Sequence, residues 1–281
     1  NVTACGSYTW NDSTYTQSGT YYSNTGSNND FSLNLQNGYM QVDNLDQPPS
    51  FTAMCWFKFN SFDTHNGILQ HKQTCTNGGG WYIGQANGNL RWVTHCGNCS
   101  SCSGIYNSNV TSLDINTWYN VAWSTDGSSY NYLYLNGNKV DSSSVPNSYI
   151  DFGINPFYAG KHLDGGNDFN SQMNIDDIIY FSHALTEAEI QQYMTCPPNG
   201  DESGLLGYWN FEEGSGSTQV IDQTSNGNDG TINGANYDTN VPTQSCNLTN
   251  VSGCDSTAVL NLTINSSNSS TINVTACGNY T

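Results

Sequence analysis

The amino-acid sequence predicts an all-β protein made of one large and one small β-sandwich. Three observations predict this class. Short apolar runs alternate with Asn, Gly and Asp turns over residues 25–195. Asn136-Gly137 separates two alternating runs, which is typical of a two-residue hairpin because both turn positions need a positive φ. Short β-rich runs near the two ends of the chain indicate one small sandwich cut in two.

The strands expected in the large sandwich are short and bounded by turn residues. They cover 39–42, 51–59, 67–72, 81–84, 90–94, 118–123, 130–135, 138–141, 157–160 and 175–181. One helix is expected after Thr186, because Thr186 and Glu189 have the spacing of a capping box, and it should run to about Met194. Leu185 and Ile190 are expected to pack together beside its first turn.

A series of motifs in this region identifies a known fold. In order they are FTAMCWFKF at 51–59, GWYIG at 80–84, NTWYNVAW at 116–123, LYLNG at 133–137, YAG at 158–160, IDDIIY at 175–180 and ALTEAEI at 184–190. This order resembles the laminin-G-like, concanavalin-A-like lectin/glucanase jelly roll, which implies a jelly-roll β-sandwich over residues 25–195. The resemblance is specific for fold but not for function, because lectins, glycosidases, adhesion modules and passive spacers share this sandwich.

Residues 196–246 contain a segment out of its usual order. The runs at 206–216 and 222–234 look like the opening hairpin of such a domain, yet they follow the sandwich. Either the segment folds back as outer strands of its own sandwich or it completes the sheet of a neighbouring copy. Folding back is expected, because a Cys196 to Cys246 disulfide would close the loop and restrict its reach.

The first nine residues recur at the end of the chain. Residues 1–9 and 273–281 differ only by Ser7 against Asn279. Such a recurrence of the first residues at the end of the chain predicts a tandem array of repeats. Residues 1–24 and 247–270 resemble the two parts of an immunoglobulin-like repeat of very large secreted bacterial proteins, and 271–281 would start the next repeat. The inter-repeat strand would contain Val274, Ala276, Cys277 and Tyr280. It either begins the next domain of one chain or pairs with the sheet of a separate subunit.

The ten cysteines indicate an oxidising compartment. Strand alternation places Cys55 with Phe57 and Phe59, so it is expected to be buried and free. The expected disulfides are Cys5 with Cys254, Cys196 with Cys246, and two bridges among Cys75, Cys96, Cys99 and Cys102, although connectivity does not follow from sequence. The alternative is a zinc or iron site formed by His95 and the C-x-x-C-x-x-C run. Disulfides are favoured because a metal site needs reduced thiolates.

The charge balance excludes several partners. Five Lys and Arg face 23 Asp and Glu, which gives a formal net charge of −18. Nucleic acids and anionic membranes attract basic surfaces, so neither is expected as a partner. No apolar run is long enough to insert into a membrane. The expected location is extracellular or at the cell surface, with any secretion signal outside this stretch.

No enzymatic site is expected. Glycosidases of the resembled fold use two carboxylates across a cleft, and the few Glu residues show no such spacing. The five His residues show no spacing with Ser or Asp that would define a nucleophilic triad. The sequence therefore predicts no catalytic residue and no organic cofactor.

Two kinds of binding site are candidates. Asp164, Asp168, Asp176, Asp222, Asn226 and Asn228 offer oxygen ligands for a structural calcium ion, although Asn, Asp and Gly clusters also simply form turns. Asp63, His65, Asn66 and His162 are candidates to ring a glycan-binding site at one edge of the sandwich. Candidate glycosylation positions near the repeat junction are Asn247, Asn250, Asn261, Asn265, Asn268 and Asn273.

These features favour a structural and adhesive repeat unit of an extracellular bacterial filament or surface stalk, in which copies join through terminal β-strands. The alternative is a calcium-dependent, lectin-like carbohydrate-binding module displayed on the stalk. The expected partners are neighbouring copies in the first case and glycans in the second.

Overall fold

The computed structural model describes most of the chain. The described residues are 2–5, 7–10, 13–15, 18–22, 29–36, 38–71, 80–95, 105–107, 112–128, 130–144, 153–164, 167–244, 248–249, 255–256 and 259–265. They fall into two compact units, one that joins Asn1–Thr25 to Cys246–Thr281 and one that spans Gly26–Ser245. Both ends of the chain therefore belong to one unit, and the long stretch between them forms the other.

The terminal unit contains a three-stranded sheet of order β1-β25-β4. In it β1 (Val2–Cys5) runs parallel to β25 (Val259–Asn265), which runs antiparallel to β4 (Gly19–Tyr22). Two short antiparallel pairs complete the described part, namely β2 (Tyr8–Trp10) with β3 (Ser13–Tyr15) and β23 (Leu248–Thr249) with β24 (Asp255–Ser256). Its immunoglobulin-like character stays a prediction.

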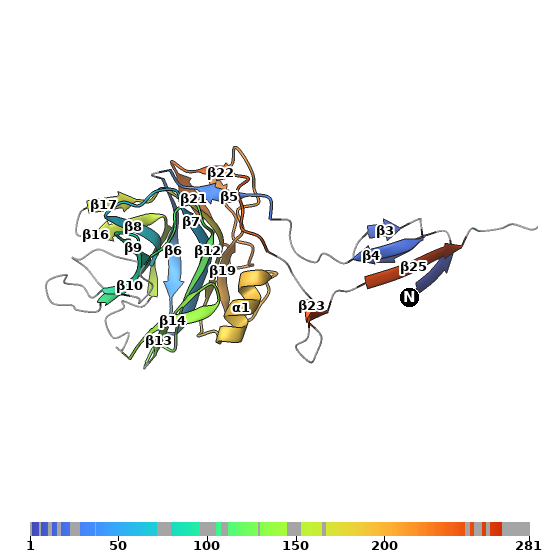
Figure 1. The fold of residues 1–281 in the computed structure, drawn as a ribbon, viewed down its shortest axis with the longest axis horizontal. Coiled ribbons are helices and arrows are strands. Elements are labelled where there is room, and N and C mark those ends of the chain that lie inside the picture. The colour runs from blue at the N-terminus through green and yellow to red at the C-terminus, as the bar shows by residue number, and fades with distance from the viewer. Residues whose placement is uncertain are drawn as a thin grey trace, which may run out of the picture. The chain divides into compact units, whose positions relative to one another are not determined.

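The Gly26–Ser245 unit is a sandwich of two eight-stranded sheets (Figure 1). The first sheet has the order β11 (Ile105–Asn107), β10 (Asn89–His95), β9 (Gly80–Ala86), β8 (His65–His71), β15 (Gly153–Ala159), β6 (Tyr39–Gln47), β21 (Gly230–Asn233) and β20 (Gln219–Val220). The second has β14 (Asn138–Ser143), β13 (Asn131–Leu135), β12 (Tyr119–Thr125), β7 (Phe51–Phe59), β18 (Met173–Phe181), β5 (Ser32–Asn34) and β22 (Asn236–Asp238), with β19 (Leu205–Trp209) also paired to β18. The all-β prediction is confirmed.

The inner faces of the two sheets form one core. Strand alternation accounts for it in β7, where Phe51, Cys55 and Phe57 point inward and are fully buried. Cys55 is free and buried, as predicted. Aromatic rings bridge the sheets, with Phe51 stacked on Trp81 at a centroid distance of 5.0 Å. This core fixes the register of both sheets, because a shift of one residue would turn each apolar set outward.

Local signals in the sequence form the expected turns and helix. Asn136 and Gly137 have φ values of 50° and 73°, which confirms the hairpin between β13 and β14. Helix α1 (Glu187–Thr195) begins with the predicted capping box of Thr186 and Glu189. Its buried Ile190 joins a second cluster with Leu185 on the outer face of the second sheet. One further hairpin, β16 (Lys161–Asp164) with β17 (Asn167–Asn170), was not among the predicted strands.

The segment after α1 pairs with this same sandwich. Strand β19 lies against β18, β21 against β6, and β22 against β5. Cys196 is disulfide-bonded. Cys246, its predicted partner, lies outside the described residues.

A histidine lies in the centre of this core. His71 is fully buried, its Nδ1 is 3.1 Å from the Tyr180 hydroxyl, and its Nε2 is 3.3 Å from the carbonyl oxygens of Leu45 and Asn155. Burial lowers its pKa from 6.5 to about 3, partly offset by the two carbonyl contacts. The imidazole is therefore neutral in the folded protein at physiological pH.

Because His71 is neutral in the folded protein, we expect the protein to lose stability in acid. The folded-state pKa lies below the unfolded value, so the stabilisation is complete above pH 6.5 and is lost as the pH falls toward 3. The slope from this group should approach about 1.4 kcal/mol per pH unit. Denaturant unfolding of the protein and of His71→Gln between pH 7 and pH 4 measures it. The variant should be less stable at pH 7, and the difference between the two proteins should shrink on acidification. A constant difference would contradict the prediction.

Candidate functional site

The candidate site lies on the outer face of the first sheet, where the β16–β17 hairpin packs on β8 and His162 of the hairpin contacts Tyr82 of β9 (Figure 1). Trp81 and Ile83 of β9 point into the core, so Tyr82 and Gly84 face outward. Gly67 of β8 and Arg91 of β10 are both paired with Gly84, which places them on the same outward row. The two glycines leave this row without side chains at its centre.

The missing side chains of these glycines allow close packing. A Cβ on Gly67 would lie 2.3 Å from the Lys161 carbonyl oxygen, so the backbone of β16 rests directly on β8. A Cβ on Gly84 would lie 2.0 Å from the Tyr82 hydroxyl, which donates a hydrogen bond of 2.8 Å to the Asn66 carbonyl. The Ser171 hydroxyl also donates to the Gly67 carbonyl at 2.7 Å. These contacts hold the hairpin against the sheet.

Two of the four predicted glycan-binding residues, Asp63 and His65, have side chains that reach this surface, whereas His162 is only 4% exposed. His162 of β16 stacks on Tyr82 with ring centroids 4.1 Å apart. The His65 ring lies 6.2 Å from the His162 ring. Asp63 is exposed, and its N–H donates to Asn66 Oδ1 at 2.9 Å. Asn66 itself is fully buried beneath them, so it positions Asp63 and does not reach the surface.

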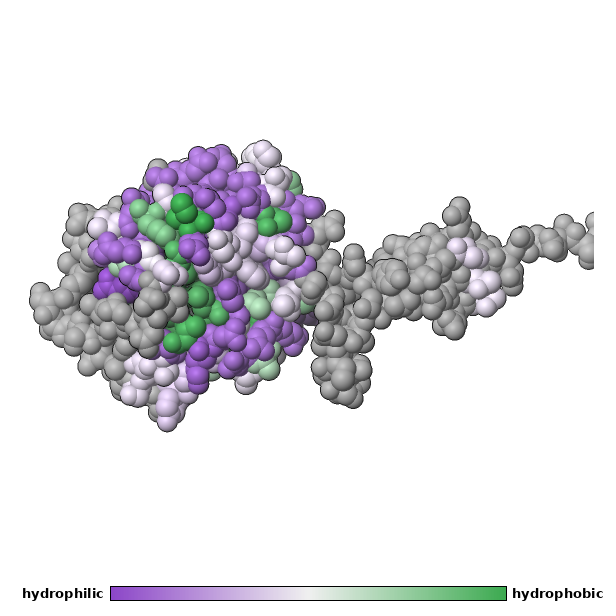
Figure 2. Space-filling view, viewed as in Figure 1, coloured by the Kyte–Doolittle hydropathy of each residue, from purple (hydrophilic) through white to green (hydrophobic). Residues whose placement is uncertain are grey.

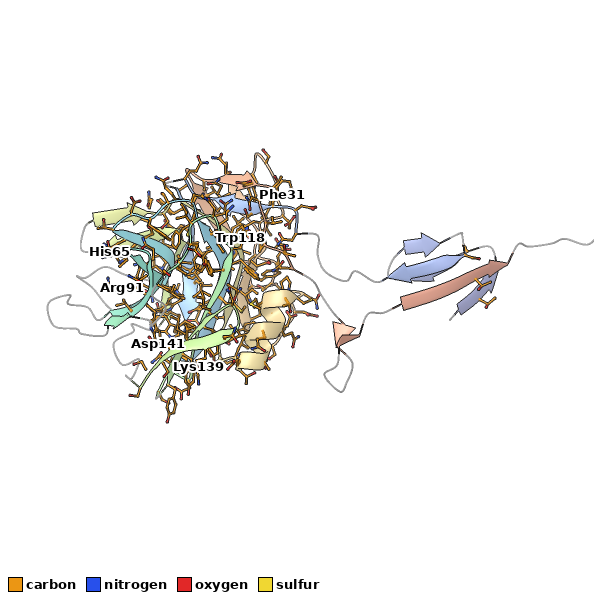
Figure 3. All side chains as sticks on the ribbon, viewed as in Figure 1. Phe31, His65, Arg91, Trp118, Lys139 and Asp141 are labelled. Atoms are coloured by element: carbon orange, nitrogen blue, oxygen red, sulfur yellow. The ribbon has the colours of Figure 1, made fainter. Side chains whose placement is uncertain are left out.

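Sequence reasoning missed three members of this site. Tyr82 supplies the stacking ring, and Gln85 donates from Nε2 to the Asp63 carbonyl at 2.8 Å and to Asn66 Oδ1. Arg91 is half-buried, and its Nε has no hydrogen-bond partner within the described residues. Figure 3 shows His65 and Arg91 on the side of the sandwich formed by β8–β10. We call Asp63, His65, Tyr82, Arg91 and His162 the histidine face.

The predicted calcium ligands lie in three different places. Asp164 and Asp168 belong to β16 and β17, and their side chains lie outside the described residues. Asp176 is in β18, whereas Asp222, Asn226 and Asn228 share one turn after β20. No group of three or more His, Cys, Asp or Glu side chains able to hold a metal is found in the described ranges. Calcium binding therefore stays a prediction.

The Asp222 turn is held by its own hydrogen bonds. Asp222 Oδ1 accepts from the N–H groups of Tyr208 and Thr224, and its Oδ2 accepts from the Asn228 N–H. The Nδ2 atoms of Asn226 and Asn228 both donate to the Leu206 carbonyl. These bonds are sufficient to explain the run of Asp and Asn residues as a turn that fixes β19.

Asp176 and Asp177 form a buried carboxyl pair at a β-bulge. The register against β7 shifts after Asp176, and Asp177 has a φ of 45°. Burial and the neighbouring Asp177 charge raise the pKa of Asp176 well above its usual range, and burial raises the pKa of Asp177 to about 6. Asp177 accepts hydrogen bonds from the Tyr208 hydroxyl at 2.7 Å and Gln244 Nε2 at 2.6 Å. Gln244 in turn accepts from Asn29 Nδ2 at 3.0 Å.

Several predicted residues lie wholly or by their side chains outside the described residues. They are Cys5, Cys75, Cys96, Cys99, Cys102, Cys246, Cys254, Cys277, Val274, Ala276, Tyr280, Asn247, Asn250, Asn261, Asn265, Asn268 and Asn273. Their predicted roles in disulfides, repeat junctions and glycosylation stay predictions.

The two-sheet sandwich, with helix α1 on one outer face, has the architecture of the lectin and glucanase class. The chain belongs to the concanavalin A-like lectin/glucanases superfamily, because the Laminin_G_3 family model matches residues 33–191. A search among curated proteins gave no match.

Solved structures share the fold. A "putative carbohydrate binding protein" from Bacteroides ovatus is 22% identical, with a TM-score of 0.57, over 78% of this chain and 62% of that protein. This chain thus spans less than two thirds of that neighbour. A heptameric SAP-like pentraxin from Limulus polyphemus is 13% identical, with a TM-score of 0.50, over 73% of this chain and 95% of the pentraxin. At these identities the likeness concerns the fold alone.

The close contact at Gly67 predicts the effect of a small substitution. Gly67→Ala should push β16 away from β8 and separate His162 from Tyr82, at a cost of about 1–3 kcal/mol. Hydrogen exchange of the β16 and β17 amides and denaturant unfolding measure it. Thr231→Ala, at an exposed position of the same sheet, is the control. Unchanged exchange in Gly67→Ala would show that the hairpin does not depend on this contact.

Proposed function

We propose that the large sandwich is a carbohydrate-binding module and that the histidine face contacts the glycan. The observation that carries this proposal is that the solvent-accessible Asp63 and His65 lie beside the buried stack of His162 on Tyr82. Asp63 and His65 belong to one segment, whereas His162 comes from a segment far away in the sequence. Membership of a lectin and glucanase superfamily supports the proposal.

The chemistry of the face suits sugar hydroxyls. Imidazole nitrogens accept or donate hydrogen bonds, the Asp63 carboxylate accepts them, and the Arg91 guanidinium donates several. The stacked Tyr82 and His162 rings hold the β16–β17 hairpin in place before a ligand binds. A binding surface that is already ordered lowers the entropy cost of binding. The surface in view is mainly hydrophilic, with separate hydrophobic spots (Figure 2), as a surface for polar ligands requires.

The proposed module binds without catalysis. The buried carboxyl pair Asp176 and Asp177 lies in β18 of the second sheet, whereas the histidine face lies on the first. Both oxygens of Asp177 already accept hydrogen bonds from the protein. No helix in the described part of the chain is long and apolar enough to cross a membrane. Display outside the cell is part of the proposal and agrees with the disulfide at Cys196.

A second candidate function is a repeat unit of a filament. Strand β1 is an edge strand of the terminal sheet and pairs with β25. Its sequence Val2–Cys5 is identical to Val274–Cys277, so the later segment fits the same edge in a neighbouring copy. Electron microscopy of native material tests this. A filament with regular globular bulges would support it, and separate particles of the size of one chain would contradict it.

A glycan array with the full chain tests carbohydrate binding. The protein should retain a defined set of glycans, and the double variant His65→Ala/Arg91→Ala should bind them about tenfold or more weakly, since it loses hydrogen bonds to charged or polar groups. Thr231→Ala serves as the control. Parallel arrays in calcium and in EDTA test the predicted calcium dependence. Full retention by the double variant would place binding elsewhere, and no binding by the wild-type protein would refute the proposed function.

A further inference from the structure

A row of tyrosines lies on the outer face of the second sheet, away from the strands that carry the histidine face. Tyr130 directly precedes β13, and Tyr132 and Tyr134 alternate along it, so the three side chains share one face, while Leu133 points into the core. Tyr134 is buried against the α1 cluster, Tyr132 is half-buried and Tyr130 is 54% exposed. The exposure of the tyrosine side chains thus increases along the row, from Tyr134 to Tyr130.

The outer two rings are held in one orientation. The ring planes of Tyr130 and Tyr132 differ by 2°, with centroids 6.0 Å apart. Tyr132 contacts Tyr134 edge to face at 6.5 Å. The Tyr130 backbone is fixed by Asp126, since the Tyr130 N–H donates to Asp126 Oδ1 at 3.1 Å and the Asp126 N–H donates to the Tyr130 carbonyl at 3.3 Å. An exposed ring whose position is fixed in this way binds a flat ligand at low entropy cost.

A lysine on the neighbouring strand completes this surface. Lys139 of β14 is exposed, and its Nζ lies 4.9 Å from the Tyr132 ring centroid. Figure 3 shows Lys139 on β14. The described residues include no carboxylate in an ion pair with Lys139, although the whole chain has 23 acidic side chains. Two carboxylates lie beside the tyrosine row: Asp126, whose Oδ1 accepts from the Tyr130 N–H, and Glu187, whose charge contributes to raising the pKa of Tyr134.

We propose that Tyr130, Tyr132 and Lys139, here called the tyrosine ledge, bind a pyranose ring that carries a carboxylate. The C–H face of the sugar packs on the exposed tyrosine ring, and the carboxylate pairs with the Lys139 ammonium. Charge complementarity favours the acidic sugar, because its carboxylate gains a charge-assisted contact with the Lys139 ammonium that a neutral sugar lacks. This ledge extends the proposed carbohydrate binding to a second surface with its own residues.

The composition of the surface disfavours a protein partner. The other exposed large hydrophobic side chains among the described residues are Ile115, Ile154 and Ile221. None of them is on β13 or β14, and Ile154 and Ile221 lie in or beside strands of the first sheet. Among the described residues, therefore, no apolar patch of the size that a stable protein interface buries surrounds the ledge.

Calorimetric titration of the full chain tests the ledge. The probes are oligomers of galacturonic acid, glucuronic acid and sialic acid, each as the free acid and as its methyl ester. The wild-type protein should bind at least one free acid about tenfold more tightly than its ester. Lys139→Gln should abolish this preference, because it weakens binding of the free acid much more than binding of the ester. Tyr130→Ala should weaken both forms. Both positions are exposed, and unfolding temperatures check that each variant is folded.

Other variants separate the two surfaces. His65→Ala should leave the acid-over-ester preference intact, because it acts on the other sheet, and Thr231→Ala should change nothing. If His65→Ala abolishes the preference while Lys139→Gln retains it, acidic sugars bind at the histidine face and the ledge is refuted. Equal binding of acid and ester across the whole panel, or no binding of any probe, would likewise overturn the ledge. Only the glycan array with the His65 and Arg91 variant decides the proposed function of the histidine face.

Discussion

The contact between the two sheets is made by large aromatic rings, and every other feature of the sandwich depends on it. Phe51 of the second sheet stacks on Trp81 of the first sheet, and its ring centroid lies 5.8 Å from that of Tyr180 in the second sheet. Strands of both sheets therefore meet at Phe51. His71 takes part in this cluster only as a neutral ring, with its two nitrogens next to the Tyr180 hydroxyl and two backbone carbonyls. A charged imidazole there would have no counter-ion within the described core. Side chains thus fill the inner faces within the described residues, and both binding surfaces proposed above lie on outer faces.

Those outer faces differ because different elements cover them. Helix α1 shields part of the second sheet and buries Tyr134, which leaves Tyr130 exposed at the end of the same row. On the first sheet the β16–β17 hairpin lies over β8 and brings His162 onto Tyr82. Both proposed binding surfaces therefore lie beside a covering element that fixes their aromatic rings.

Local signals explain how much could be predicted. The capping box of Thr186 and Glu189 and the turn at Asn136 and Gly137 depend on neighbours only a few residues away, and both were predicted correctly. Alternation likewise identified the buried face of β7, including Cys55. The histidine face was predicted only in part, because the pairing of His162 with Tyr82 depends on glycines that allow β16 to rest on the sheet. No sequence pattern marked Arg91 as a site residue. Its place on the outward row depends on the pairing of β10 with β9, which sets Arg91 opposite Gly84. The bulge at Asp177 was also missed, because alternation assumes an unbroken strand.

The hydrogen bonds among Asn29, Gln244 and Asp177 have a mechanical consequence. The chain enters the sandwich near Asn29 and leaves it near Gln244, and these two side chains are 3.0 Å apart. Tension applied at these two points is carried across this short link and the adjacent β5 and β22 pair. Stretching the chain at these two points would therefore part these polar contacts and the short pairing of β5 with β22 first.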